Sequence, residues 1–139
     1  MDKLVMPNEV LLEEAARLLD EGRDVTFTPL GSSMLPFIRG GRDSVRLHKK
    51  DTVDVGDIIL VRLPGRYVLH RLIRVDGDCL ELMGDGNIQG TERCTKADVI
   101  GTVTAIFRGK RTVVPGDGRW WRRIKPLRRY ILAIYRRLP

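Results

Sequence analysis

Near the start of the chain, apolar positions recur at helical spacing. Apolar side chains repeat every three or four residues, at Leu11, Ala15, Leu18 and Leu19. Pro7-Asn8 supplies a cap before this repeat, and Gly22 follows its last turn. The pattern predicts an amphipathic helix over about residues 9–21, with its apolar face covering one end of a β core.

Beyond Gly22 the pattern changes to the alternation and short apolar runs that are typical of strands. The segments with this pattern are 24–29, 44–48, 58–61, 67–75, 79–83, 98–108 and 111–114. Turn-forming pairs such as Pro64-Gly65 and Asp76-Gly77 separate neighbouring strands, and residues 88–97 are expected to form a polar loop. We therefore expect a mainly β (α+β) fold with an N-terminal helix.

The last part of the chain differs in charge from the rest. Residues 119–139 contain eight Arg or Lys and no acid, which leaves 17 basic and 18 acidic residues in positions 1–118. Apolar residues in the tail fall on a helix-like stripe that starts at Trp120, and Pro126 would kink its first third. We expect one domain over 1–118, followed by a basic amphipathic helix over 119–139.

This tail pattern is typical of a helix that lies on an anionic membrane surface. Packing against the protein's own body or against a partner is the alternative. Nucleic acid is a weaker candidate partner, because basic charge without a recognisable binding motif is unspecific. No run in the sequence reaches the roughly 20 apolar residues of a membrane-spanning helix. We expect a cytoplasmic location, with peripheral attachment at the inner face of the membrane through the tail.

Composition narrows the chemistry further. The chain has 139 residues, 42% of them hydrophobic and 31% charged, which is enough for one core without help from metals or disulfides. Cys79 and Cys94 lack metal-type spacing, and the only histidines are His48 and His70. The sequence therefore favours no metal and no cofactor. A disulfide between the two cysteines is the less favoured state, since nothing else points to an oxidising compartment.

The candidate chemistry centres on one turn, Gly31-Ser32-Ser33-Met34-Leu35-Pro36. Its glycine and proline, with Pro29 just before it, suit a sharp turn that can hold a serine side chain outward. Two serines in a loop are also ordinary turn chemistry, so a nucleophile would need a base nearby. His70 is a candidate base, although a strand histidine beside Val68 and Leu72 is by default a hydrogen-bonded structural residue.

Five short boxes occur in a fixed order along the chain. They are Ser-Met-Leu-Pro at 33–36, Gly-Asp-Ile-Ile at 56–59, Leu-His-Arg at 69–71, Gly-Asp-Gly-Asn at 84–87 and Asp-Val-Ile-Gly at 98–101. Over about residues 25–107 this order resembles the catalytic fold of the signal peptidase I and LexA-type (S24/S26) serine peptidases. Bacterial signal peptidases and LexA-like proteases carry a lysine as base, whereas the endoplasmic-reticulum type carries a histidine, and this chain has His70 there.

The resemblance implies roles for named residues. Ser33 would be the nucleophile and its backbone amide the first oxyanion donor, while His70 would be the base and Asp85 the supporting acid. Asp98 is the reserve carboxylate, and Ser32 is a weaker supporting hydroxyl beside the nucleophile. Signal peptidases often add an oxyanion hydroxyl two residues before the nucleophile, but this chain has Gly31 at that position.

The function implied is that of a serine endopeptidase that cleaves a peptide or precursor protein, often after small side chains. A catalytically inactive peptide-binding module on the same scaffold is the alternative, and Gly31 is its best support. A basic β domain recruited to nucleic acid or anionic lipid, with an incidental serine turn, is the third hypothesis.

Overall fold

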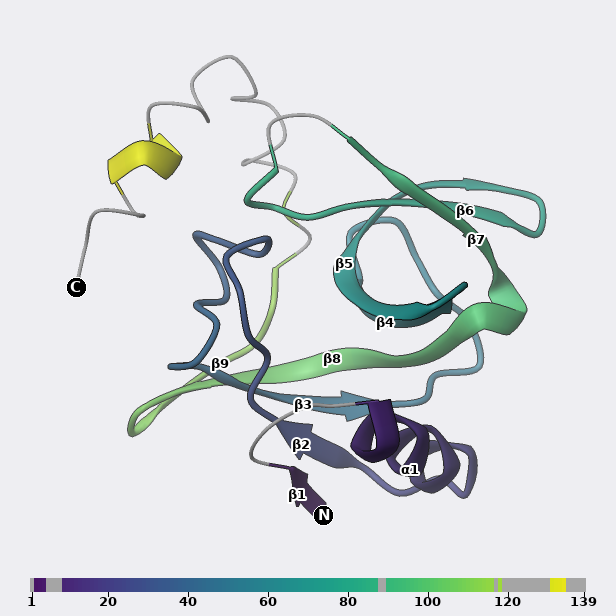
Figure 1. Ribbon diagram of the computed structural model, residues 1–139, viewed down its shortest axis with the longest axis horizontal. Helices are drawn as coiled ribbons and strands as arrows, with labels where there is room; N and C mark the ends of the chain where they lie inside the picture. The colour runs from purple at the N-terminus through teal and green to yellow at the C-terminus, as the bar shows by residue number, and fades with distance from the viewer. Residues whose placement is uncertain (1, 5–8, 88–89, 117, 119–130, 135–139) are drawn as a thin grey trace.

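The computed structural model describes residues 2–4, 9–87, 90–116, 118 and 131–134. These residues form a curled sheet with one helix against it (Figure 1). The elements are β1 (Asp2–Leu4), α1 (Glu9–Asp20), β2 (Val25–Phe27), β3 (Ser44–His48), β4 (Ile58–Leu63), β5 (Arg66–Asp76), β6 (Cys79–Met83), β7 (Glu92–Thr95), the 3-10 turn η1 (Lys96–Asp98), β8 (Val99–Arg108) and β9 (Arg111–Val113). The predicted mainly β fold with a short N-terminal helix is confirmed.

The sheet has the strand order β1-β2-β3-β8-β4-β5-β6-β7, and β9 pairs with β8 outside this path. β1 runs parallel to β2, and the other pairs are antiparallel. The long strand β8 therefore joins the first half of the sheet to the second. Register shifts interrupt its pairing with both β3 and β4, and such irregularities bend strands and increase their twist. The curl brings β5 and β6 over the remainder of the sheet (Figure 1).

Two main clusters of buried apolar side chains lie on either side of the curled strands. One joins the apolar face of α1 to β2, β3 and β8, and the other lies among β4, β5, β6 and β7. Ala15 and Leu19 of α1 are almost fully buried, as the helical periodicity predicts. A Cβ on Gly101 of β8 would lie only 3.1 Å from Leu19 Cδ1, so a glycine here allows the helix to pack closely.

The structure differs from the sequence prediction around β7. Residues 92–95 form this strand within the segment that we expect to be a polar loop. Its sequence Glu-Arg-Cys-Thr has only Cys94 buried, so the side-chain pattern carries little strand signal. Main-chain pairing with β6 defines the strand instead.

The predicted tail helix lies almost entirely outside the described residues. Within residues 131–134 the backbone is helical, and Leu132 is fully buried against Leu35. In the parts of the chain that the structure describes, no helix combines the length and apolar character that crossing a membrane requires.

Cys79 and Cys94 are free thiols on neighbouring strands. Cys94 lies opposite Leu80 in the β6–β7 register, while Cys79 lies opposite Thr95. Successive side chains of a strand point to opposite faces, so the two thiols project from different faces of the sheet. Cys79 is exposed and Cys94 is buried accordingly.

Candidate active site

Ser33 lies in a loop over residues 29–43 that joins β2 to β3, called the serine loop below. The two limbs of this loop meet at its base, where Gly41 N donates to Pro29 O at 2.7 Å. A Cβ on Gly40 would lie 2.1 Å from Gly31 O, and Gly31 has a φ of +91°. Glycine is therefore needed at both positions for the loop to close in this conformation.

Asp43, the last residue of the serine loop before β3, holds the end of the loop through its side chain. Its side chain is fully buried and accepts hydrogen bonds from Arg39 N at 2.8 Å and Arg42 Nε at 2.7 Å. Burial alone would raise the pKa of Asp43, but the hydrogen bonds from Arg42 and Arg39 N outweigh it and lower the pKa below its ordinary value. The loop is thus closed by an ionised carboxylate.

A second segment, the glycine box (residues 84–87), packs directly on the serine loop. Gly86 N donates to Ser33 O at 2.7 Å, and a Cβ on Gly86 would lie 2.3 Å from Ser32 O. A Cβ on Gly84 would lie 2.4 Å from Ser33 O and 3.0 Å from His70 Nε2. Both glycines therefore have to lack a side chain, and Gly84 marks a point where Ser33 and His70 converge.

His70 comes from β5 and is only 7% exposed. Its Nδ1 pairs with Glu92 Oε1 from β7, two strands away across the sheet. Its Nε2 is the nitrogen that lies against Gly84. One ring nitrogen therefore meets a carboxylate, while the other faces the place where the serine loop packs.

Asp85 pairs with Arg71, whereas the resemblance implies that it supports His70. Its Oδ1 accepts from Arg71 Nε at 3.1 Å, and its Oδ2 accepts from Arg71 Nη2 at 2.6 Å. The carboxylate on His70 Nδ1 is Glu92, a residue that the sequence reasoning missed. The sequence carries little indication of this role, because Glu92 lies in a short polar strand that only the β6–β7 pairing brings near His70.

Arg71 is itself a buried centre of contacts. It is 1% exposed, and its Nη1 donates to Gly56 O at 2.9 Å and to Gly116 O at 2.5 Å. Its guanidinium carbon lies 5.2 Å from the centre of the Phe37 ring in the serine loop. Arg71 thus connects the glycine box, the turn before β4 and the segment after β9.

The remaining predicted site residues lie elsewhere. Asp98 accepts hydrogen bonds from Thr95 N at 2.8 Å and from Thr95 Oγ1 at 3.1 Å, which caps the 3-10 turn η1. Ser32 is exposed, and its carbonyl accepts from Leu35 N at 3.2 Å within the turn. The structure therefore gives Asp98 a capping partner and brings Ser33, His70 and Glu92 together.

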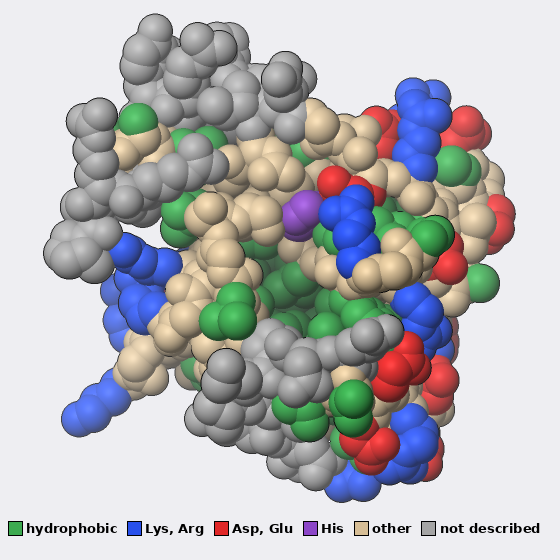
Figure 2. All heavy atoms as spheres, viewed as in Figure 1, with side chains coloured by type: hydrophobic (Ala, Val, Ile, Leu, Met, Phe, Trp, Pro, Cys, Tyr) green, Lys and Arg blue, Asp and Glu red, His purple; other side chains and the backbone are tan. Residues whose placement is uncertain are grey.

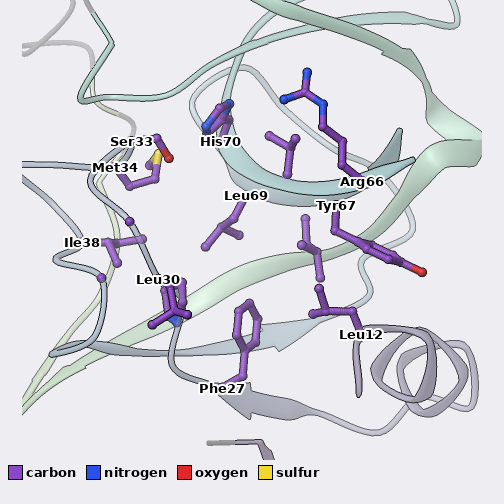
Figure 3. A pocket seen from close by; sticks show the side chains of 15 residues that line it. Leu12, Phe27, Leu30, Ser33, Met34, Ile38, Arg66, Tyr67, Leu69 and His70 are labelled. Atoms are coloured by element: carbon purple, nitrogen blue, oxygen red, sulfur yellow. The ribbon is translucent and has the colours of Figure 1, made fainter. Parts of the chain in front are cut away.

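An apolar pocket of about 470 Å³ adjoins Ser33 and His70. Its walls are mostly hydrophobic and come from α1, β2, β4, β5 and the serine loop; they include Leu12, Phe27, Ile38, Leu60, Tyr67 and Leu69. Ser33 and His70 lie at the same end of it, with the apolar side chains extending away from them (Figure 3). Viewed as in Figure 1, the molecular surface shows a hollow with hydrophobic side chains inside it (Figure 2).

The arrangement has the parts that acyl transfer requires. A serine, an imidazole and a carboxylate come from three segments: the imidazole pairs with the carboxylate, and Ser33 and His70 both line the pocket. Among the described residues, no three His, Cys, Asp or Glu side chains cluster in a way that could hold a metal ion.

Comparison with known proteins identifies the family of the chain. No curated protein matches the chain. The family model described as Peptidase S24-like matches residues 5–104, a span that contains Ser33, His70 and Glu92. Because this match covers more than half of the sequence, the chain belongs to the Peptidase S24-like family.

Proposed function

We propose that this protein is a serine endopeptidase in which Ser33 is the nucleophile, His70 the base and Glu92 the carboxylate that orients the base. The observation that supports it most strongly is the two-sided placement of His70. Nδ1 meets Glu92, and Nε2 lies at Gly84, the residue that also packs on Ser33. The S24-like scaffold is the second support.

The first half of the reaction forms an acyl-enzyme. His70 Nε2 accepts the proton of Ser33 Oγ as the oxygen attacks the substrate carbonyl, and the Ser33 amide donates a hydrogen bond to the oxyanion. The imidazolium then gives its proton to the leaving amine as the peptide bond breaks. Glu92 accepts from Nδ1–H, which fixes the tautomer and stabilises the imidazolium.

The second half releases the product. A water molecule gives its proton to His70 Nε2 and attacks the ester carbonyl on Ser33. When the tetrahedral intermediate collapses, the proton returns to Ser33 Oγ and the carboxylic acid leaves. This cycle uses the three side chains, the Ser33 backbone amide and water.

An open strand edge offers a place for an extended substrate. β6 first pairs with β5 at Arg71, opposite Met83, so residues 66–70 of β5 pair only with β4 among the described strands. Leu72 exchanges hydrogen bonds with Gly56 N and Asp57 O on the β4 side. By the alternation of an antiparallel strand, the main-chain groups of Leu69 and Tyr67 face the other, open side. A peptide added along this edge would run past the pocket toward His70.

Asp85 and Arg71 act as positioning residues in this proposal. Their buried ion pair holds the glycine box, and Gly86 of that box donates to Ser33 O. Asp85 N also donates to Met34 Sδ at 3.4 Å, directly after the nucleophile. The pair therefore supports the serine loop without exchanging a proton in the reaction.

The test is peptide cleavage by the full chain, followed by mass spectrometry on a mixed peptide library. We expect products in the wild type that disappear in both Ser33→Ala and His70→Ala. Products that persist in Ser33→Ala would contradict the proposal. Peptide binding of equal affinity in wild type and Ser33→Ala, with no product in either, would instead establish the non-catalytic binding module.

A further inference from the structure

We infer that the substrate inserts a large apolar side chain into the pocket beside Ser33, so that cleavage selects against small and basic residues at that position. This inference rests on the proposed function and names the substrate class of the same site. It departs from the small side chains that the family resemblance implies. The pocket's size, its walls and its position relative to the open strand edge carry the argument.

The size of the pocket exceeds what a small side chain would fill. Its volume of about 470 Å³ lies within the roughly 300–1,000 Å³ that is typical of sites for whole small-molecule ligands. A methyl group would leave most of this space without contacts, whereas a leucine or phenylalanine side chain would touch the walls on several sides. Apolar pockets of this kind discriminate by about ten-fold or more for each methylene that is missing.

The walls are fixed by the core of the protein. Phe27, Ile38 and Leu60 are at most 2% exposed and belong to the main apolar cluster. Packed side chains of this kind relax little when a neighbouring space is left empty. The pocket therefore has no easy way to shrink around a small residue.

Charge also selects the occupant. Arg66 is exposed and is the only Lys, Arg, Asp or Glu among the described residues that line the pocket. A lysine or arginine side chain of the substrate would lose its water there without gaining an acidic partner. The pocket thus favours an apolar side chain over a basic one.

Leu69 is the residue that we assign to set this specificity. It precedes His70 on β5, is only partly buried, and projects into the pocket (Figure 3). Its main chain also faces the open edge where an extended peptide would add. A bulkier side chain at position 69 would occupy the space that the substrate needs.

The experiment uses one peptide that the enzyme cleaves. The peptide is synthesised again with Ala, Val, Leu, Phe or Lys as the residue immediately before the scissile bond. For the wild type we expect kcat/KM to be at least ten-fold higher with Leu or Phe than with Ala, and lowest with Lys. In Leu69→Trp we expect the order of Ala and Phe to reverse. Val75→Trp, at an exposed position farther along the same strand, is the matched control and should keep the wild-type order.

The outcomes separate the two proposals. A wild type that prefers Ala, or a Leu69→Trp variant with the wild-type order, would overturn the pocket assignment while leaving the peptidase intact. If no peptide is cleaved, the proposed function fails, and the pocket is tested by binding of the same labelled peptides to Ser33→Ala. A ranking of affinities with Phe and Leu above Ala would support the inference, and an equal or reversed ranking would contradict it.

Discussion

Two neighbouring residues of β5, His70 and Arg71, each meet a carboxylate, but the two pairs lie in different surroundings. His70 pairs with Glu92 beside the pocket, where its second nitrogen faces the serine loop. Arg71 pairs with Asp85 through two hydrogen bonds in the interior. An imidazole can exchange a proton near neutral pH, whereas a guanidinium stays charged. Under the proposed function, adjacent positions on one strand would separate proton transfer from structural support.

The largest expected effect is on the His70 side of this comparison. Ser33→Ala and His70→Ala should each lower kcat/KM for peptide cleavage by about 10⁴-fold or more, because either change removes the nucleophile or its base. The thermal unfolding midpoint of Ser33→Ala should stay near that of the wild type, whereas His70→Ala should lower it, because the change leaves the largely buried Glu92 without its partner. His48→Ala is the matched histidine control, since His48 pairs with Asp24 at a partly exposed site, and it should keep activity. Cleavage by either active-site variant at the His48→Ala level would contradict the assignment.

The role of Glu92 is tested by a change that keeps its size. Glu92→Gln should lower kcat by about 10²-fold or more, because an amide neither fixes the His70 tautomer as a carboxylate does nor stabilises the imidazolium. Substrate affinity in a Ser33→Ala background should be unchanged by Glu92→Gln. An unchanged kcat would remove Glu92 from the proposed mechanism.

Loss of the Arg71–Asp85 pair should lower the free energy of unfolding. Arg71→Met leaves Asp85 as a buried carboxylate without its guanidinium partner, and such losses cost about 3–5 kcal/mol. Glu92→Gln should cost less than about 1 kcal/mol, since the amide can still accept a hydrogen bond. Denaturant unfolding of both variants measures the contrast. Equal losses in the two variants would contradict the division between a supporting pair and a catalytic pair.

The comparison also shows what the sequence could and could not predict. The helix and most strands follow from local signals, namely apolar periodicity and turn residues. The assignment of Ser33 and His70 as site residues comes from the family resemblance of the ordered boxes and stays a prediction. The partners of His70 and Arg71 do not follow from local signals, because they depend on how β5, β6 and β7 pair. A carboxylate in a Gly-Asp-Gly-Asn box is a reasonable partner for the imidazole on sequence grounds. In the folded chain that carboxylate, Asp85, forms an ion pair with Arg71, the residue after His70.

The glycine box joins the two sides, and Gly84 is its most sensitive position. Gly84→Ala would place a Cβ 2.4 Å from Ser33 O and 3.0 Å from His70 Nε2, so one of these groups must move. We expect a loss of kcat of about 10²-fold, as a displacement of about 1 Å can produce. Gly116→Ala is the control, because no atom lies within 4 Å of its Cβ position. Equal activities in the two variants would show that Gly84 does not limit the site.

The smallest effect concerns the strand that carries Glu92. Burial raises the pKa of the Cys94 thiol on β7 to about 11, so its thiolate should be scarce at pH 8. Alkylation at pH 8 should therefore modify the exposed Cys79 much faster than Cys94, and the rate at Cys94 should rise as the pH approaches 11. Peptide mapping measures both rates. Equal rates at pH 8 would mean that β7 does not pack on β6 as the structure shows.

The central claim is that Ser33 and His70 act as one unit, and the double variant Ser33→Ala/His70→Ala tests it most directly. Groups that act together lose nearly everything when the first is removed. We predict that kcat/KM of the double variant equals that of either single variant within about three-fold, because no proton transfer remains to be lost. Losses that multiply would mean that the hydroxyl and the imidazole contribute independently, which would contradict the account.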